Sequence, residues 1–144
     1  MMTLTQAETA IHQELMRIAK LEELTVEMVN KPLSHGKPFE PPKNKAWSKV
    51  FIQYADSQIV GIGDKPCIRD QGIISIQCFA PLGSGLMVLS ELCDTWRKHL
   101  QSFGVSHLEV YKVHAPQSMT AYNANGSNED DFYGKIIRAE FRVN

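Results

Sequence analysis

Apolar residues recur at helical spacing in two separate stretches of the chain, which predicts two amphipathic helices. In the first stretch, at about 5–22, Thr5 and Glu8 fit a capping box that would begin the helix. In the second, Ser84 is expected to cap the start, and Gly104 to end the helix in a left-handed conformation. The predicted buried stripes are Ala7, Ile11, Leu15 and Ile18 in the first helix, and Leu89, Leu92, Cys93, Trp96, Leu100 and Phe103 in the second.

Elsewhere apolar and polar residues alternate, as they do in strands that bury one face. The longest run, Ile68 to Ala80, places Ile74, Ile76 and Cys78 on one side. Gly72 within this run is expected to mark a bend or bulge. The other predicted strands lie at 24–28, 47–55, 58–62, 108–114 and 132–143, and the last of them turns Ile137, Ala139, Phe141 and Val143 inward.

The resulting order, α-β-β-β-β-α-β-β, favours an α+β fold, because runs of strands between helices pair mainly antiparallel. We expect a mainly antiparallel, mixed sheet of about five strands with both helices packed on one face. A length of 144 residues and 43% hydrophobic content suit a single domain, 1–144, with one core. Two long loops are predicted, at about 30–46 and 115–131, and four prolines exclude regular pairing through most of the first.

Charge and composition narrow the class of protein. A formal net charge of −1 argues against a protein that binds nucleic acid through its overall charge. No window approaches the roughly 18 consecutive apolar residues of a membrane-spanning helix, and the first ten residues lack the pattern of a signal peptide. These features predict synthesis in the cytoplasm. The three cysteines show no C-x-x-C pair, so free thiols are expected and a zinc site is not.

The motifs that could carry catalysis are incomplete. The segment Gly83-Ser84-Gly85 lies between a predicted strand and a predicted helix, as the glycine-rich segment of a phosphate-binding loop does. However, Val88 occupies the position where a dinucleotide-binding pattern needs its third glycine. Ser84 has Leu82 and Leu86 where a nucleophile elbow requires glycines. The acidic run 129–131 lacks the ordered spacing of a calcium loop. We therefore expect no enzyme activity, no cofactor and no metal.

The two long loops differ in charge. Residues 31–49 hold five lysines and one acid, Glu40, whereas the second loop ends in three consecutive acids. Such segments suit two solvated surfaces, and they also suit the two halves of a head-to-tail interface that closes into a ring. The candidate interaction residues are Lys31, Lys37, Phe39, Lys43, Lys45, Arg69, Asn125, Glu129, Asp130 and Asp131.

Several short motifs resemble the phage tail terminator-like family, which includes the lambda-type tail terminators. They are Pro38-Phe39 with Pro41-Pro42, Trp47 opening a strand, Gly63, Arg69 with Gly72, Phe79-Ala80-Pro81, Gly85 before a helix that ends near Phe103, and a last strand that closes on Phe141. The chain departs from the family at Gly36, where the family often has Asn, and at Phe132-Tyr133, where it tends to have Trp.

The resemblance implies a structural virion protein that forms a ring, typically a hexamer, on the head-proximal end of the tail tube. Its partners would be copies of itself, the major tail tube protein and the head–tail connector proteins, with no membrane and no sequence-specific nucleic acid. It would act in the host cytoplasm during assembly and then remain in the virion tail. Two alternatives stay open: a neck or head–tail joining protein, and a small-ligand-binding protein or enzyme that uses the Gly83–Gly85 helix start.

Overall fold

The computed structural model describes residues 2–28, 45–59, 63, 68–81, 83, 85–118 and 132–144. The two helices are α1 (Leu4–Leu21) and α2 (Leu86–Leu100). The strands are β1 (Val26–Met28), β2 (Trp47–Tyr54), β3 (Gln58–Ile59), β4 (Ile68–Pro81), β5 (Gly104–Val105), β6 (Leu108–Val113), β7 (Gln117–Ser118) and β8 (Phe132–Val143).

One mixed sheet contains all the described strands, and it confirms the α+β class. The strand order is β1-β2-β4-β8-β6-β5, with β3 beside β4 and β7 beside β8. Only β1 and β2 run parallel, whereas every other described pair is antiparallel. The sheet has eight strands rather than the expected five or so. The two strands that were not expected, β5 and β7, are two residues long, too short to leave an alternating pattern in the sequence.

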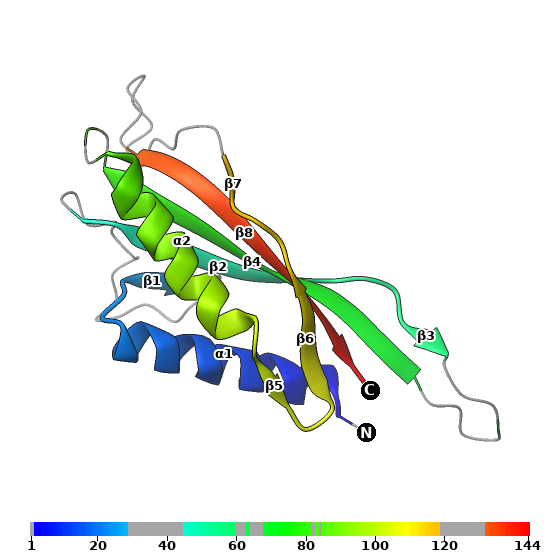
Figure 1. The fold of residues 1–144 in the computed structure, drawn as a ribbon. Coiled ribbons are helices and arrows are strands. Elements are labelled where there is room, and N and C mark those ends of the chain that lie inside the picture. Colours follow the sequence, from blue (N-terminus) through cyan, green and yellow to red (C-terminus); the bar gives the residue numbers. More distant parts are fainter. Residues whose placement is uncertain are drawn as a thin grey trace, which may run out of the picture.

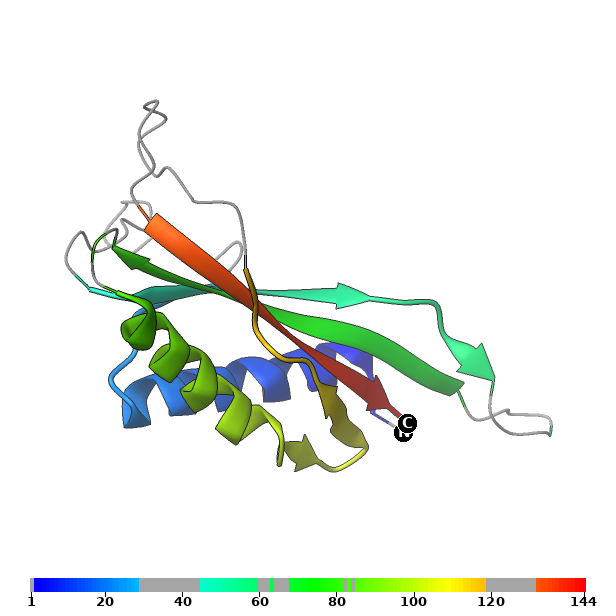
Figure 2. The ribbon, with the colours of Figure 1, turned by 45° about the horizontal axis from the view of Figure 1, so that its top comes forward.

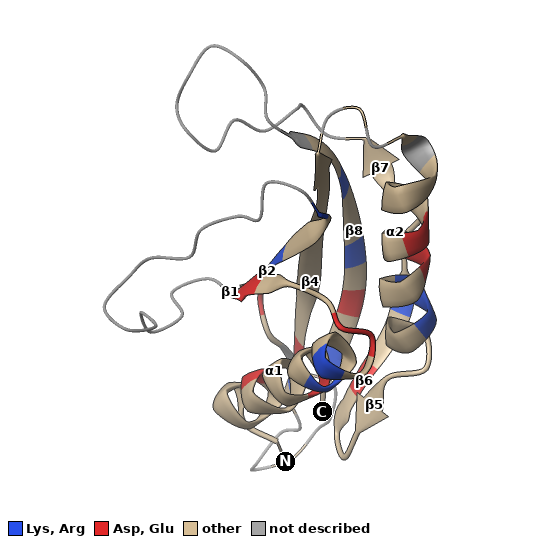
Figure 3. Ribbon diagram, turned by 90° about the vertical axis from the view of Figure 1, so that its left-hand side faces the viewer, with Lys and Arg blue, Asp and Glu red and all other residues tan. Residues whose placement is uncertain are grey.

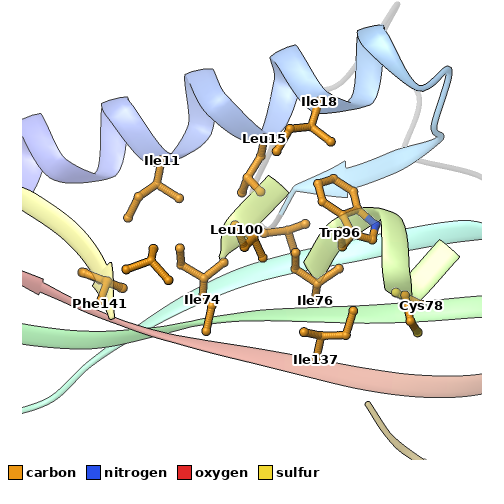
Figure 4. Close-up of a cluster of buried hydrophobic side chains, with 14 of the residues drawn as sticks. Ile11, Leu15, Ile18, Ile74, Ile76, Cys78, Trp96, Leu100, Ile137 and Phe141 are labelled. Carbon is orange, nitrogen blue, oxygen red and sulfur yellow. The ribbon is translucent and has the colours of Figure 1, made fainter. Parts of the chain in front are cut away.

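Both helices cover the same face of this sheet (Figures 1 and 2). Their buried stripes meet side chains of β4 and β8 in a single hydrophobic core (Figure 4), which confirms the inward faces read from the sequence. Phe103 is the exception, because it lies beyond the end of α2 and is only partly buried. The largest fully buried side chains are Trp47, Trp96, Phe79, Phe141, Ile11, Leu15, Ile18, Ile74, Ile76, Leu89, Leu100 and Leu108.

The helix ends differ from the predicted ones. The capping box of α1 is formed by Thr3 and Gln6, two residues earlier than the predicted Thr5 and Glu8. The Gln6 N–H donates to the Thr3 hydroxyl oxygen (3.2 Å), and the Thr3 N–H donates to the Gln6 side-chain oxygen (2.9 Å). Both pairs have the required spacing, so the sequence pattern alone does not choose between them.

The predicted ends of α2 are wrong. The N-cap residue is Gly85 rather than the predicted Ser84, and glycine has no side chain to accept a capping hydrogen bond. At the other end, the helix stops at Leu100 with Gln101 in a right-handed conformation. Gly104 instead begins β5, and its φ is not positive. The left-handed residue near this end is Ser106, in the turn between β5 and β6.

Gly72 does not mark a bulge. It sits in an unbroken ladder, paired with Tyr54 on one side and Phe141 on the other. A Cβ atom at this position would lie 2.5 Å from Cζ of Phe141 and 2.6 Å from the Gln53 carbonyl oxygen. The glycine is therefore explained by the Phe141 ring, which occupies the space where a side chain would stand. The bulge that the structure does contain lies in β6, between Val110 and Lys112.

The sheet has two distinct ends. At one end, which we call the Trp47 end, Trp47, Phe79 and Gly134 lie side by side in register on β2, β4 and β8. At the opposite end, β3 and the start of β4 extend beyond the last residues of β8 (Figure 1). The two termini also meet there, since the Met2 N–H donates to the Asn144 carbonyl (3.3 Å).

Candidate interaction surfaces

The structure describes two of the ten candidate interaction residues, and it does not bring them together. Lys45 is exposed and lies two residues before the start of β2, at the Trp47 end. Arg69 is partly buried on β4, where its Nε donates to the Asn144 side-chain oxygen (2.7 Å). Arg69 lies ten positions from Phe79, the β4 residue at the Trp47 end, which is roughly 33 Å along a strand. Arg69 and Lys45 therefore lie at opposite ends of the sheet, and Arg69 holds the side chain of the C-terminal residue.

The remaining eight candidates lie outside the described residues. They are Lys31, Lys37, Phe39 and Lys43 of the first predicted loop, and Asn125, Glu129, Asp130 and Asp131 of the second. The structure does describe β2 and β8, the strands that follow these two segments in the sequence. The lysine-rich segment returns to the sheet at Lys45, just before β2, and the acidic segment returns at the start of β8.

Both charged segments therefore rejoin the sheet at its Trp47 end. Only β4 separates β2 from β8, so the two points of return are about 10 Å apart, which is two strand spacings. The same end receives the connection from β4 to α2. This arrangement was not predictable from the sequence, because it depends on strand order.

The sheet face away from the helices carries a ladder of polar contacts along β6 and β8. Figure 3 marks the basic and acidic positions along β8. Arg142 on β8 contacts its cross-strand partner Glu109 (2.5 Å) and lies 5.3 Å from the centre of the Tyr111 ring. The next contact along β8 joins Glu140 to His114 Nε2 (2.8 Å) and more distantly to Lys112 (3.8 Å). Sequence reasoning missed this ladder, although its signal was present: basic and acidic residues alternate with the inward apolar residues of the last strand.

Aromatic side chains cover the Trp47 end of the same face. The rings of Trp47 and Phe79 stack with centroids 4.6 Å apart, and both residues are fully buried. A Cβ atom at Gly134 would lie 3.0 Å from two Phe79 ring atoms, so this glycine allows the ring to lie flat across β8. These contacts hold together the parts of β2 and β8 that follow the two charged segments in the sequence.

A buried polar cluster joins α2 to the sheet on the helix-covered face. Trp96 Nε1 donates to the Ser48 hydroxyl oxygen (2.9 Å), and the Ser48 hydroxyl in turn points its proton toward Cys78 Sγ (3.9 Å). Ser48, Trp96 and both thiols of Cys78 and Cys93 are fully buried. A hydrogen bond with Cys93, together with burial, raises the pKa of the Cys78 thiol, so Cys78 stays protonated. The cluster satisfies buried polar groups and fits a structural role.

Tyr54, at the end of β2, connects the sheet to α1. Burial first, and then the negative charge of Glu8, raise the pKa of Tyr54 to about 12. The phenol therefore remains protonated near neutral pH and can donate its hydrogen bond to the Glu8 carboxylate. Its ring also meets Phe141 edge to face, with centroids 6.1 Å apart.

Within the described part of the chain, no three His, Cys, Asp or Glu side chains are grouped as they would be around a metal ion. Neither described helix is long and apolar enough to cross a membrane.

Comparison with known proteins supports the fold. No protein-family model matches the sequence, and no curated protein matches it. One solved structure, of a protein that carries no functional name, is similar over 100% of this chain and 97% of its own, with a TM-score of 0.70 and 16% sequence identity. At this identity the likeness concerns the fold alone.

Proposed function

We propose that this chain is a structural virion protein that caps the head-proximal end of a phage tail tube as a ring, ending tube polymerisation and preparing the tail for head joining. The sequence motifs shared with tail terminators, from Pro38-Phe39 to the final strand, motivate the proposal. On this proposal the chain catalyses no reaction, and its partners are its own copies, the tube protein and the head–tail connector.

The observation that carries the proposal is the return of both charged segments to one end of the sheet. A ring that caps a tube must present one end of every subunit to the same template. Segments of opposite charge that rejoin the sheet about 10 Å apart can both face such a template. Each contact can be weak, because a template that offers several sites in a ring adds valency. We therefore propose that the Trp47 end meets the tube or the neighbouring subunit.

Reversal of the acidic run tests this proposal. The variant Glu129→Lys, Asp130→Lys, Asp131→Lys is expected to give overlong tails, because the ring no longer assembles on the tube end, while the chain itself stays folded. Tail lengths are measured by electron microscopy of lysates in which this variant replaces the normal protein, and folding is checked by circular dichroism.

A matched control changes the same number of charges elsewhere. Glu23, Glu91 and Asp94 are exposed, and the last two lie on α2, so their replacement by lysine should leave tail length unchanged. Overlong tails in both variants would show a general effect of charge and contradict the assigned surface. Complete removal of the protein distinguishes the proposed function from the main alternative, a neck protein. Loss of a terminator gives overlong tails, whereas loss of a neck protein leaves tails of normal length without heads.

A further inference from the structure

Two buried thiols meet between α2 and β4. Cys78 lies on β4 and Cys93 on α2, both side chains are fully buried, and neither belongs to a disulfide. A hydrogen bond joins the two thiols, so the two sulfur atoms are neighbours across the boundary between helix and sheet. The third cysteine of the sequence, Cys67, lies outside the described residues. The fold thus brings two cysteines that are separate in the sequence together as a dithiol.

The hydrogen bonds around this dithiol run in one direction, toward Cys93. Trp96 Nε1 donates to the Ser48 hydroxyl oxygen (2.9 Å), and the Ser48 hydroxyl donates to Cys78 Sγ (3.9 Å). Cys78 in turn donates its S–H proton to Cys93. Cys93 is therefore the last acceptor in a relay of donors, and such an arrangement favours negative charge on its sulfur.

Positive charge also lies near Cys93. Lys135 on β8 is the cross-strand partner of Cys78, so both side chains leave the same face of the sheet, and Arg97 follows Cys93 by one helical turn. The hydrogen bond from Cys78 lowers the pKa of the Cys93 thiol, while burial raises it. The charges of Lys135 and Arg97 also lower this pKa, against the opposing charge of Asp94. Cys93 is thus the better nucleophile of the pair, and Cys78 is the protonated partner.

We propose that Cys78 and Cys93 form a redox lock, in which a two-electron oxidant such as hydrogen peroxide joins them in a disulfide that ties α2 to β4. The Cys93 thiolate attacks one peroxide oxygen: an S–O bond forms, the O–O bond breaks, and the hydroxide that leaves takes up the proton Cys93 released. The Cys78 sulfur then attacks the Cys93 sulfur, so that the S–S bond forms and the S–O bond breaks. The hydroxyl group leaves with the Cys78 proton as water. The two thiols together lose two electrons, which reduce the peroxide to two molecules of water.

Burial makes this lock slow to close and slow to open. Neither cysteine is exposed, so oxidants and reductants reach the sulfur atoms only when α2 opens locally. The start of α2 lacks two features that usually stabilise a helix start, since its N-cap is Gly85, with no capping side chain, and its first turn has no acidic residue. The chain therefore keeps free thiols in a reducing compartment and acquires the link during long exposure to an oxidising one. This inference goes beyond the tail role and does not depend on it.

Mass spectrometry of the folded full chain, after prolonged incubation with dilute hydrogen peroxide, tests the lock. The wild type is expected to lose two hydrogen atoms, and its proteolytic peptides should show Cys78 joined to Cys93. Cys67→Ser is the matched control and should form the same link, whereas Cys93→Ser should form none. The link should raise the melting temperature by roughly 5–10 °C, because it constrains the unfolded chain.

The peptide map is read on the wild type, so the test does not depend on how well Cys93→Ser folds. Addition of oxygen atoms to Cys93, with Cys78 left as a free thiol, overturns the inference, because it shows that the two sulfur atoms do not come together. A wild type whose thiols all survive the treatment overturns it as well. Links that involve Cys67 as often as Cys78, or a melting temperature that falls on oxidation, contradict a lock between α2 and β4.

Discussion

Replacement of Gly72 by alanine is expected to lower the free energy of unfolding by about 3 kcal/mol, the upper part of the usual range for an overpacked core. The added methyl group would overlap the Phe141 ring and the Gln53 carbonyl oxygen, both closer than 3 Å. The ring belongs to a fully buried side chain, and the carbonyl belongs to the backbone of β2, so neither can move without disturbing the sheet. Urea denaturation followed by circular dichroism measures the change.

Gly104→Ala provides the control for this prediction. A Cβ atom at Gly104 would meet its nearest neighbour at 3.5 Å, which is ordinary contact, and its φ is not positive. Its effect should therefore stay below about 1 kcal/mol. If Gly72→Ala proves as mild as Gly104→Ala, the close packing of Phe141 over β4 is wrong.

Replacement of Trp96 by alanine should destabilise the chain by about 3–5 kcal/mol, as is typical of large aromatic residues removed from a core. Trp96 is fully buried in the core between α2 and the sheet, and its indole N–H is the donor to buried Ser48. The substitution therefore leaves both a cavity and a buried hydroxyl without this partner. Thermal and urea denaturation of the purified variant measure the loss.

A double-mutant cycle separates the hydrogen bond from the packing. Trp96→Phe keeps most of the ring volume but removes the N–H, and Ser48→Ala removes the acceptor. The double variant should lose about 1 kcal/mol less than the sum of the two single losses, because the two residues share one interaction. Strict additivity would show that the 2.9 Å contact contributes nothing to stability.

The sequence predicted the features that depend on local periodicity. The buried stripe of α1 and the inward residues of β4 and β8 are as expected, because burial of one face imposes a helical or alternating pattern on the residues themselves. The α+β class followed from the order of those elements. The single-residue details of the helix ends did not follow, since Thr3-Gln6 and Thr5-Glu8 fit the same capping pattern.

Features that depend on distant contacts could not be read from the sequence. In the sequence, Gly72 suggested a bend or bulge. The structure explains this glycine by its contact with Phe141, which is distant in the sequence. The return of the charged segments to one end of the sheet required the strand order β2-β4-β8. Among the candidate interaction residues that the structure describes, Arg69 donates a hydrogen bond to the Asn144 side chain, a contact between residues far apart in the sequence.

Electron microscopy of tail tubes mixed with the purified protein tests the tail role most directly. On the proposed function, the tubes are those of the phage or prophage whose genome would carry the chain. The proposed function predicts a ring of density on one end of each tube, and no growth at that end when tube subunits are added. Bare ends on tubes that continue to lengthen, in the presence of excess folded protein, would contradict it.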